Sequence, residues 1–330
     1  MSDEVAERRR AMLRTAMGPA IADALADGQV VELMVNPDGA LRLDRLGAGR
    51  CETGVAIDPA QVERIIRLVA SHVRAEAHDG APIVSAELPA YGDGLGGERF
   101  EGLLPPVATA PCFSIRKPAA RIYRLADYVR DGLMSAEAAR LLSLAIVERR
   151  NILVAGGTSS GKTTLANALL AEIAHLDERV ILIEDTRELQ CAARDCVALR
   201  TRAGIVTMAD LVRSTLRLRP DRIIVGEVRG AEALDMLKAW NTGHPGGIAT
   251  LHANSARAAF YRLEQLIQEA VVTVPRPLIA EAIELVIFIE GRGHARRIGE
   301  IVAVEGLDAA GGYVLRTLQA AGPSQQETGS

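Results

Sequence analysis

The segment from Gly156 to Thr163 matches the phosphate-loop pattern G-x-x-x-x-G-K-[ST] at every fixed position. In such a loop, glycines let the backbone wrap a polyphosphate, while the inward N–H groups and the start of the next helix supply positive potential. We predict that Lys162 holds the β- and γ-phosphates of a nucleoside triphosphate and that Thr163 places its hydroxyl on the accompanying Mg²⁺ ion. The predicted nucleotide-binding residues are Gly156, Gly157, Thr158, Ser159, Ser160, Gly161, Lys162, Thr163 and Thr164.

Two acidic segments each follow an apolar strand candidate. Residues 181–183 run into Glu184-Asp185, and residues 223–225 run into Gly226-Glu227. Ligands of open α/β sheets bind at the carboxyl ends of the strands, so Glu184 and Glu227 are both candidate catalytic residues, and either could be the base. Gly226 stands where the commoner Walker-B form has an acidic residue, which favours a base role or a water-mediated Mg²⁺ contact for Glu227. The alternative is that either pair begins a loop or caps a helix.

Histidine and arginine side chains supply further candidates. His252 ends a strand candidate, and we predict that it hydrogen-bonds the γ-phosphate or the attacking water. No ligand cluster accompanies His244 and His252, which disfavours a metal site between them. Arginines that lie between the two acidic segments or just after the second one include candidates for a group that stabilises the transition state from a neighbouring subunit, although most should form ordinary ion pairs. These arginines are Arg200, Arg202, Arg213, Arg217, Arg219, Arg222 and Arg229.

The elements that position these residues alternate between strands and helices. Strands are predicted at 152–155, 180–183, 223–225 and 248–251, with helices at 135–149, after Lys162 and at 208–218, 231–240 and 255–270. Such alternation predicts a mostly parallel sheet covered by helices. Three closing strands are predicted at 285–289, 298–304 and 313–318.

The first third of the chain has a different pattern. A helix is predicted over residues 1–26, followed by a hairpin of strands 30–35 and 40–43 and by a helix that begins at Asp58-Pro59 with an apolar stripe. Many prolines and glycines then indicate short strands and turns. We predict a small α+β domain at 1–115, a linker at 116–132 and an α/β domain at 133–330, of which 320–330 is polar and predicted to be disordered.

Composition sets outer limits on function. The chain has 330 residues, which favours two domains, and its 48% apolar and 3% aromatic residues suit an α/β core of aliphatic side chains. The net charge of −4 disfavours direct nucleic-acid binding. No apolar stretch is long enough for a membrane span, so we predict a cytoplasmic protein. The arginines near the N-terminus allow peripheral membrane association, although a solvated helix face is favoured.

Four motifs together resemble those of the secretion ATPase superfamily and occur in the same order along the chain. They are the phosphate loop, the two acidic segments at 184–185 and 226–227, and the stretch from His244 to His252. Within it the chain is similar to the type IV secretion and conjugal-transfer traffic ATPases, particularly the TrbB-like proteins, over nearly its whole length. The resemblance implies that 156–163 is Walker A, 184–185 the Asp box, 226–227 Walker B and 244–252 the His box. It also implies that Arg116 matches an N-domain arginine that reaches the nucleotide phosphates.

The resemblance further implies a RecA-like C-terminal domain in a homo-hexameric ATPase motor. Such a motor would power conjugative transfer or type IV secretion, docked on the cytoplasmic face of an inner-membrane channel. A pilus assembly or retraction ATPase and a nucleotide-gated scaffold with little turnover remain as alternatives. A nucleic-acid motor is disfavoured by the acidic balance, and a regulatory GTPase by the lack of an N-K-x-D sequence.

Overall fold

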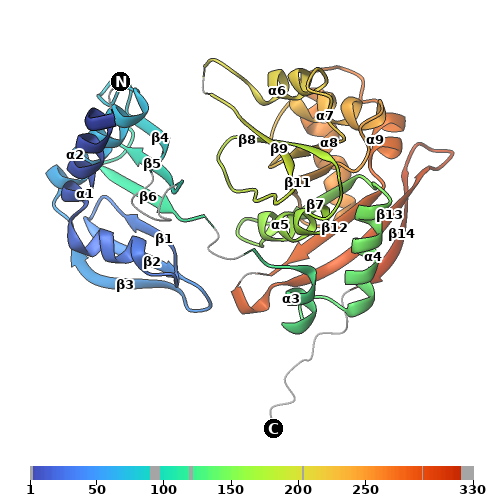
Figure 1. Ribbon diagram of the computed structural model, residues 1–330, viewed down its shortest axis with the longest axis horizontal. Helices are drawn as coiled ribbons and strands as arrows, with labels where there is room; N and C mark the ends of the chain where they lie inside the picture. The colour runs from blue at the N-terminus through green and yellow to red at the C-terminus, as the bar shows by residue number, and fades with distance from the viewer. Residues whose placement is uncertain (1–2, 90–96, 119–121, 203, 292, 321–330) are drawn as a thin grey trace, which may run out of the picture. The chain divides into compact units, whose positions relative to one another are not determined.

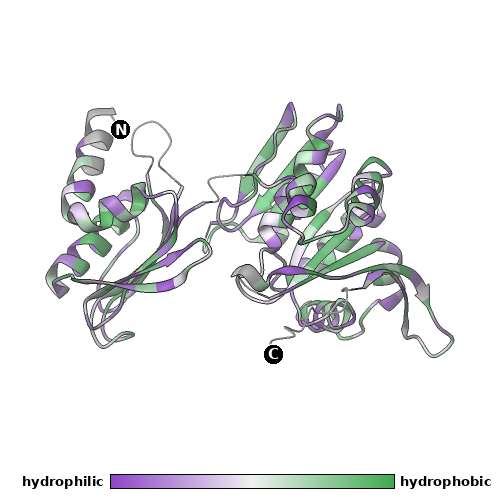
Figure 2. Cartoon of the chain, turned by 90° about the horizontal axis from the view of Figure 1, so that it is seen from below, coloured by the Kyte–Doolittle hydropathy of each residue, from purple (hydrophilic) through white to green (hydrophobic). Residues whose placement is uncertain are grey.

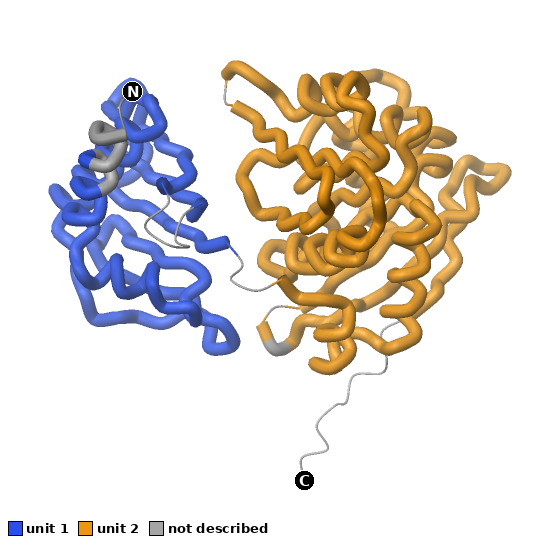
Figure 3. Tube along the Cα trace, viewed as in Figure 1, with its two compact units in different colours: residues 1–120 blue, residues 121–330 orange. Residues whose placement is uncertain are grey.

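The computed structural model describes residues 3–89, 97–118, 122–202, 204–291 and 293–320. The chain divides into two compact units, residues 1–120 and 121–330, each with its own hydrophobic core (Figure 3). Of the tail predicted to be disordered, 320–330, only Ala320 lies among the described residues, and it is the last residue of a strand.

The first unit packs two helices against a six-stranded antiparallel sheet (Figure 1). The helices are α1 (Asp3–Ala26), which is interrupted at Gly18 with a φ of 71°, and α2 (Pro59–Val73). The strand order is β3-β2-β1-β6-β5-β4. The strands are β1 (Val30–Val35), β2 (Ala40–Arg45), β3 (Gly49–Ala56), β4 (Ile83–Glu87), β5 (Arg99–Leu103) and β6 (Cys112–Arg116).

Local sequence explains the start of α2 and the turn before β2. Asp58 Oδ1 accepts a hydrogen bond from the Ala60 N–H at 2.8 Å, and Pro59 occupies the first helical position. The turn between β1 and β2 requires Gly39, because its φ is 76° and a Cβ there would lie 2.7 Å from the Ile57 carbonyl oxygen. The predicted apolar stripe of α2 is buried in the core of this unit, namely Val62, Ile65, Ile66 and Val69.

The second unit is built on an eight-stranded sheet in the order β14-β13-β12-β7-β11-β10-β8-β9. The six strands from β12 to β9 in this order are parallel, whereas β13 and β14 are antiparallel additions at one edge. The strands are β7 (Ile152–Gly156), β8 (Arg179–Glu184), β9 (Asp195–Arg200), β10 (Arg222–Val225), β11 (Ile248–His252), β12 (Leu285–Glu290), β13 (Arg297–Leu307) and β14 (Tyr313–Ala320). The predicted mostly parallel α/β sheet is therefore present.

Helices cover both faces of this sheet (Figure 1). In β7, Leu153 and Ala155 belong to the cluster beneath α6 to α9, while Ile152 and Val154 belong to the cluster beneath α3 to α5. Strands buried on both faces are apolar along their whole length, as Figure 2 shows for the centre of this unit. The helices are α3 (Leu125–Arg130), α4 (Ala136–Val147), α5 (Lys162–Ile173), α6 (Met208–Thr215), α7 (Glu232–Asn241), α8 (Ala256–Gln268) and α9 (Arg276–Ala282).

Three of these elements were not predicted from the sequence. The segment 116–132, assigned above to a linker, contains α3, whose Leu125 and Tyr128 are buried in the core of the second unit. The later part of that segment is therefore part of the α/β unit. The other two are β9, an edge strand whose residues are half-buried or exposed, and α9, which has only seven residues. Short or partly exposed elements carry little periodic signal.

Candidate nucleotide-binding and hydrolytic site

The phosphate loop joins β7 to α5 in the predicted strand-loop-helix order. Ser159 has a φ of 60° and Gly161 a φ of 97°, so the backbone turns sharply before α5 begins at Lys162. Gly156 is required by packing, because a Cβ there would lie 2.6 Å from Ser160 Oγ and 2.7 Å from the Ile289 carbonyl oxygen. The loop thus directs the N-terminus of α5, with its unpaired N–H groups, toward the carboxyl edge of the sheet.

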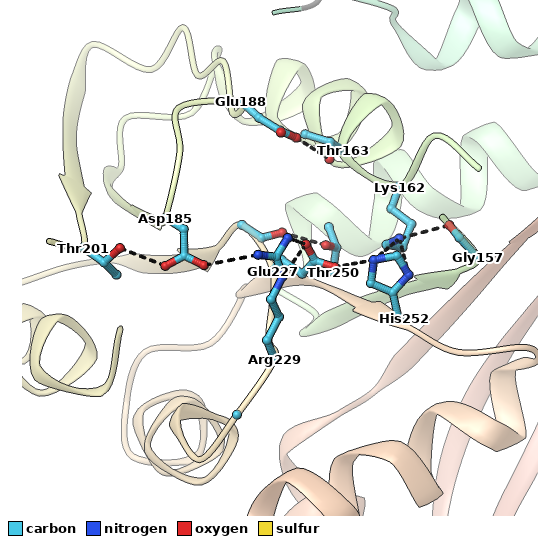
Figure 4. Close-up of polar contacts among 12 residues, drawn as sticks. Gly157, Lys162, Thr163, Asp185, Glu188, Thr201, Glu227, Arg229, Thr250 and His252 are labelled. Carbon is cyan, nitrogen blue, oxygen red and sulfur yellow. Dashed lines mark hydrogen bonds and ion pairs between the residues drawn. The ribbon is translucent and has the colours of Figure 1, made fainter. Parts of the chain in front are cut away.

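Lys162, His252 and Glu227 form a continuous chain of contacts at this edge (Figure 4). Lys162 Nζ donates to the Gly157 carbonyl oxygen at 3.1 Å and lies 3.2 Å from His252 Nδ1. His252 Nε2 lies 2.7 Å from Glu227 Oε1. Burial and the charge of Lys162 lower the pKa of His252, and Glu227 opposes this. Glu227 Oε1 is buried and has no hydrogen-bond partner among the described residues, so its approach to His252 is a close polar contact and not a well-aligned hydrogen bond.

Glu227 has a second set of partners on its other side. Arg229 Nε donates to Glu227 Oε2 at 2.9 Å, and Arg229 Nη1 lies 3.7 Å from Asp185 Oδ2. Asp185 in turn accepts a hydrogen bond from Thr201 Oγ1 at 2.8 Å. The predicted residues that end or follow β8, β10 and β11 therefore meet at one edge of the sheet (Figure 4).

Glu184 serves a different purpose from Glu227. Its side chain is buried, and Oε1 accepts hydrogen bonds from the N–H groups of Glu188 at 2.9 Å and Leu189 at 2.7 Å. A Cβ on Gly226 would lie 3.0 Å from Glu184 Cγ, so the glycine leaves room for the buried Glu184 side chain. Glu184 thus fixes the backbone of the loop that follows β8.

Burial raises the pKa of Glu184 to about 7, from an ordinary value of 4.5. Because the carboxyl pKa is raised, the folded protein binds this proton more tightly than the unfolded chain does. Proton binding therefore stabilises the folded state below pH 4.5, and this stabilisation is lost as the pH rises to about 7. Relative to Glu184→Gln, the wild type should lose about 3 kcal/mol of unfolding free energy over that window. Urea unfolding of both proteins at about pH 5 and about pH 8 measures this difference. A difference that stays constant with pH would contradict it.

Glu188 is a candidate that sequence reasoning missed. Thr163 Oγ1 donates to Glu188 Oε2 at 3.2 Å, which brings a carboxylate to the start of α5 (Figure 4). The loop is held there by Asn167 Nδ2, which donates to the Glu188 carbonyl oxygen at 3.0 Å. Hydroxyl and carboxylate oxygens are ligands that suit Mg²⁺, so Thr163 and Glu188 fit a magnesium site. The only signal in the sequence was an acidic residue four positions after Glu184.

The remaining predicted residues lie elsewhere. His244 precedes β11, at the opposite end of the strand from His252, and its Nδ1 lies 2.9 Å from the Pro220 carbonyl oxygen. Arg116 is the last residue of β6 in the first unit, and its predicted contact with nucleotide stays a prediction.

Several of the seven arginines interact within the chain. The Arg222 side chain is fully buried, paired with Glu178. Arg213 Nη2 lies 2.8 Å from Asp235 Oδ2, and Arg229 pairs with Glu227 as described. Arg200 also has an interaction of its own, and Arg202, Arg217 and Arg219 stay candidates for action in a neighbouring subunit.

Comparison with known proteins decides the family. Residues 99–290, more than half of the chain, match the family model described as "Type II/IV secretion system protein". The chain belongs to the type II/IV secretion system protein family. This membership confirms the resemblance inferred from the four motifs.

Relatives of this family member carry names from conjugation and type IV secretion. It is 50% identical over 296 residues to the conjugal transfer protein TrbB of Rhizobium radiobacter, covering 89% of this chain and 90% of that relative. It is 35% identical over 324 residues to the type IV secretion system protein PtlH of Bordetella pertussis, covering 86% and 93%. It is therefore a member of the type IV secretion and conjugal-transfer ATPase family.

A solved structure extends the likeness to the fold. The pilus retraction motor PilT with bound ADP superimposes with a TM-score of 0.60 at 20% identity, covering 92% of this chain and 83% of that one. None of the helices in the described part of this family member is long and apolar enough to cross a membrane.

Proposed function

We propose that this protein is an ATPase motor of a conjugation or type IV secretion system, with a RecA-like C-terminal domain that hydrolyses ATP to ADP and phosphate. The observation that supports this best is the run of contacts from Lys162 through His252 to Glu227 beside the phosphate loop. Such a run places a cation, a neutral hydrogen-bonding group and a carboxylate together where a γ-phosphate and its attacking water would lie.

Each residue then has a role in phosphoryl transfer. Lys162 binds the β- and γ-phosphates, and the His252 imidazole hydrogen-bonds a γ-phosphate oxygen. Glu227 orients the attacking water and accepts its proton as the water oxygen bonds to the γ-phosphorus and the bond to the ADP oxygen breaks. Thr163 and Glu188 would hold Mg²⁺, which offsets phosphate charge when bound.

Glu227 suits the role of base better than Glu184. Glu184 Oε1 already accepts two backbone hydrogen bonds inside the protein, whereas Glu227 lies next to His252 on the Lys162 side of the site. Arg229 Nε donates a hydrogen bond to Glu227 Oε2 at 2.9 Å and so fixes the position of this carboxylate.

Assembly into a homo-hexamer, with Arg116 and an arginine of a neighbouring subunit at the phosphates, completes the proposed motor. The ring would act on the cytoplasmic side of an inner-membrane channel. The names of the conjugal and type IV secretion relatives support this role, although they describe those proteins.

Specific ATPase activity is expected to rise steeply with protein concentration as rings form. In other phosphoryl-transfer proteins an arginine supplied in trans raises turnover by about 10³- to 10⁵-fold, so isolated subunits should hydrolyse ATP slowly. The measurement is activity per subunit over a range of concentrations, with assembly followed by sedimentation in the same samples. Activity that does not change as rings form would contradict an arginine in trans. Rings that bind ATP with negligible turnover would favour a nucleotide-gated scaffold.

A further inference from the structure

The turn between β12 and β13 brings an arginine onto the phosphate loop. A Cβ on Gly161 would lie 2.9 Å from both Nε and Cζ of Arg296, so the guanidinium rests directly against the loop backbone. The turn reaches this position through a sharp bend at Gly291, where φ is 76° and a Cβ would lie 2.0 Å from the Ala295 carbonyl oxygen. Arg296 is therefore held beside the site by the fold of its own turn.

Arg296 has no acceptor for its charge in the part of the chain that the structure describes. Its Nε is buried without a hydrogen-bond partner there, and no carboxylate among the described residues forms an ion pair with it. The positive charge of Arg296 acts on the nearby Tyr128 hydroxyl. That hydroxyl is also buried and has no hydrogen-bond partner among the described residues. Two neighbouring donors without acceptors, next to a phosphate loop, suggest that a bound ligand interacts with the guanidinium.

The sheet order indicates which part of a nucleotide would reach Arg296. Gly156, where the loop begins, is flanked by His252 of β11 on one side and by Ile289 of β12 on the other. The residues for phosphoryl transfer lie on the β11 side, because Lys162 contacts His252 and His252 contacts Glu227. The γ-phosphate end of ATP therefore faces β11, and the opposite end of the molecule faces the turn that follows β12.

We propose that Arg296 binds the nucleobase end of ATP, with its guanidinium plane stacked on the purine ring. Planar guanidinium groups stack on aromatic rings and on nucleic-acid bases, which an ammonium group does less well. The inference rests on the proposed ATP-binding function of the loop. Arg296 would then contact the nucleobase, on the side of the site opposite the residues that catalyse hydrolysis.

The test compares ATP with tripolyphosphate, which has the phosphates but no base or ribose. For Arg296→Ala, the KM for ATP should rise roughly tenfold while kcat stays near the wild-type value. The inhibition constant of tripolyphosphate against ATP hydrolysis should change by less than about twofold. Arg296→Lys should not restore the KM for ATP, because lysine keeps the charge but lacks the planar group.

Arg297→Ala is the matched control. Arg297 follows Arg296 in the chain, but its Nε pairs with Glu290 Oε1 at 2.6 Å. This variant removes one positive charge from the position that follows the turn, at the start of β13, and its KM for ATP should stay near the wild-type value. Thermal melting of all the variants checks that each one folds.

Several outcomes would overturn the inference. An equal loss of affinity for ATP and tripolyphosphate in Arg296→Ala, restored by lysine, would place Arg296 on the phosphates instead. No change for either ligand would remove Arg296 from the site. A wild-type protein that binds no ATP would overturn the proposed function as well, and this result is visible before any variant is made.

Discussion

Replacing Lys162 with alanine should lower kcat for ATP hydrolysis by at least about 100-fold. The ammonium group lies 3.2 Å from His252 Nδ1 at the start of α5, and removing it takes away charge that would stabilise the phosphates in the transition state. Steady-state hydrolysis and nucleotide binding would be measured on the same preparations. Wild-type turnover in this variant would contradict the assignment of the loop.

Lys238 offers a matched control for this experiment. It is an exposed residue of α7, outside the candidate site, and its replacement by alanine removes the same charge from the same unit. Lys238→Ala should keep near wild-type turnover. Because Lys162 is mostly buried, thermal melting must show that Lys162→Ala is still folded.

Replacing Glu227 with glutamine should lower kcat by roughly 100- to 10,000-fold and leave the affinity for ATP within a few-fold of the wild type. Glutamine keeps the shape of the side chain but cannot accept the proton of the attacking water. Single-turnover hydrolysis separates this step from nucleotide binding.

Glu184→Gln is the comparison that decides between the two strand-end carboxylates. Its amide oxygen can still accept the hydrogen bonds from Glu188 and Leu189, so kcat should fall by less than about tenfold. Equal losses in the two variants would mean that Glu184 takes part in proton transfer. Retained activity in Glu227→Gln would contradict the base role of Glu227.

The candidate site was predictable from the sequence where short contiguous patterns determine it. The phosphate loop is one continuous segment, and Glu184, Glu227 and His252 each end or follow a strand of one parallel sheet. Because the carboxyl ends of parallel strands meet at one edge, their proximity followed from the alternation of strands and helices.

The rest depended on tertiary contacts that no local pattern encodes. Glu188 reaches Thr163 only because Glu184 and Asn167 hold the intervening loop. Arg296 reaches Gly161 from a turn far along the chain, between a parallel strand and an antiparallel one. The sequence could not separate the roles of Glu184 and Glu227, because both are carboxylates at the end of a strand. They differ in burial and in hydrogen bonding, which depend on tertiary structure.

The close approach of Gly226 to Glu184 couples these two positions energetically. A Cβ at 226 would lie 3.0 Å from Glu184 Cγ, so the Glu184 side chain would have to shift by a few tenths of an ångström to admit a larger residue there. The effects of substitutions at 226 and 184 on the free energy of unfolding should therefore not be additive, because the two side chains would compete for one space.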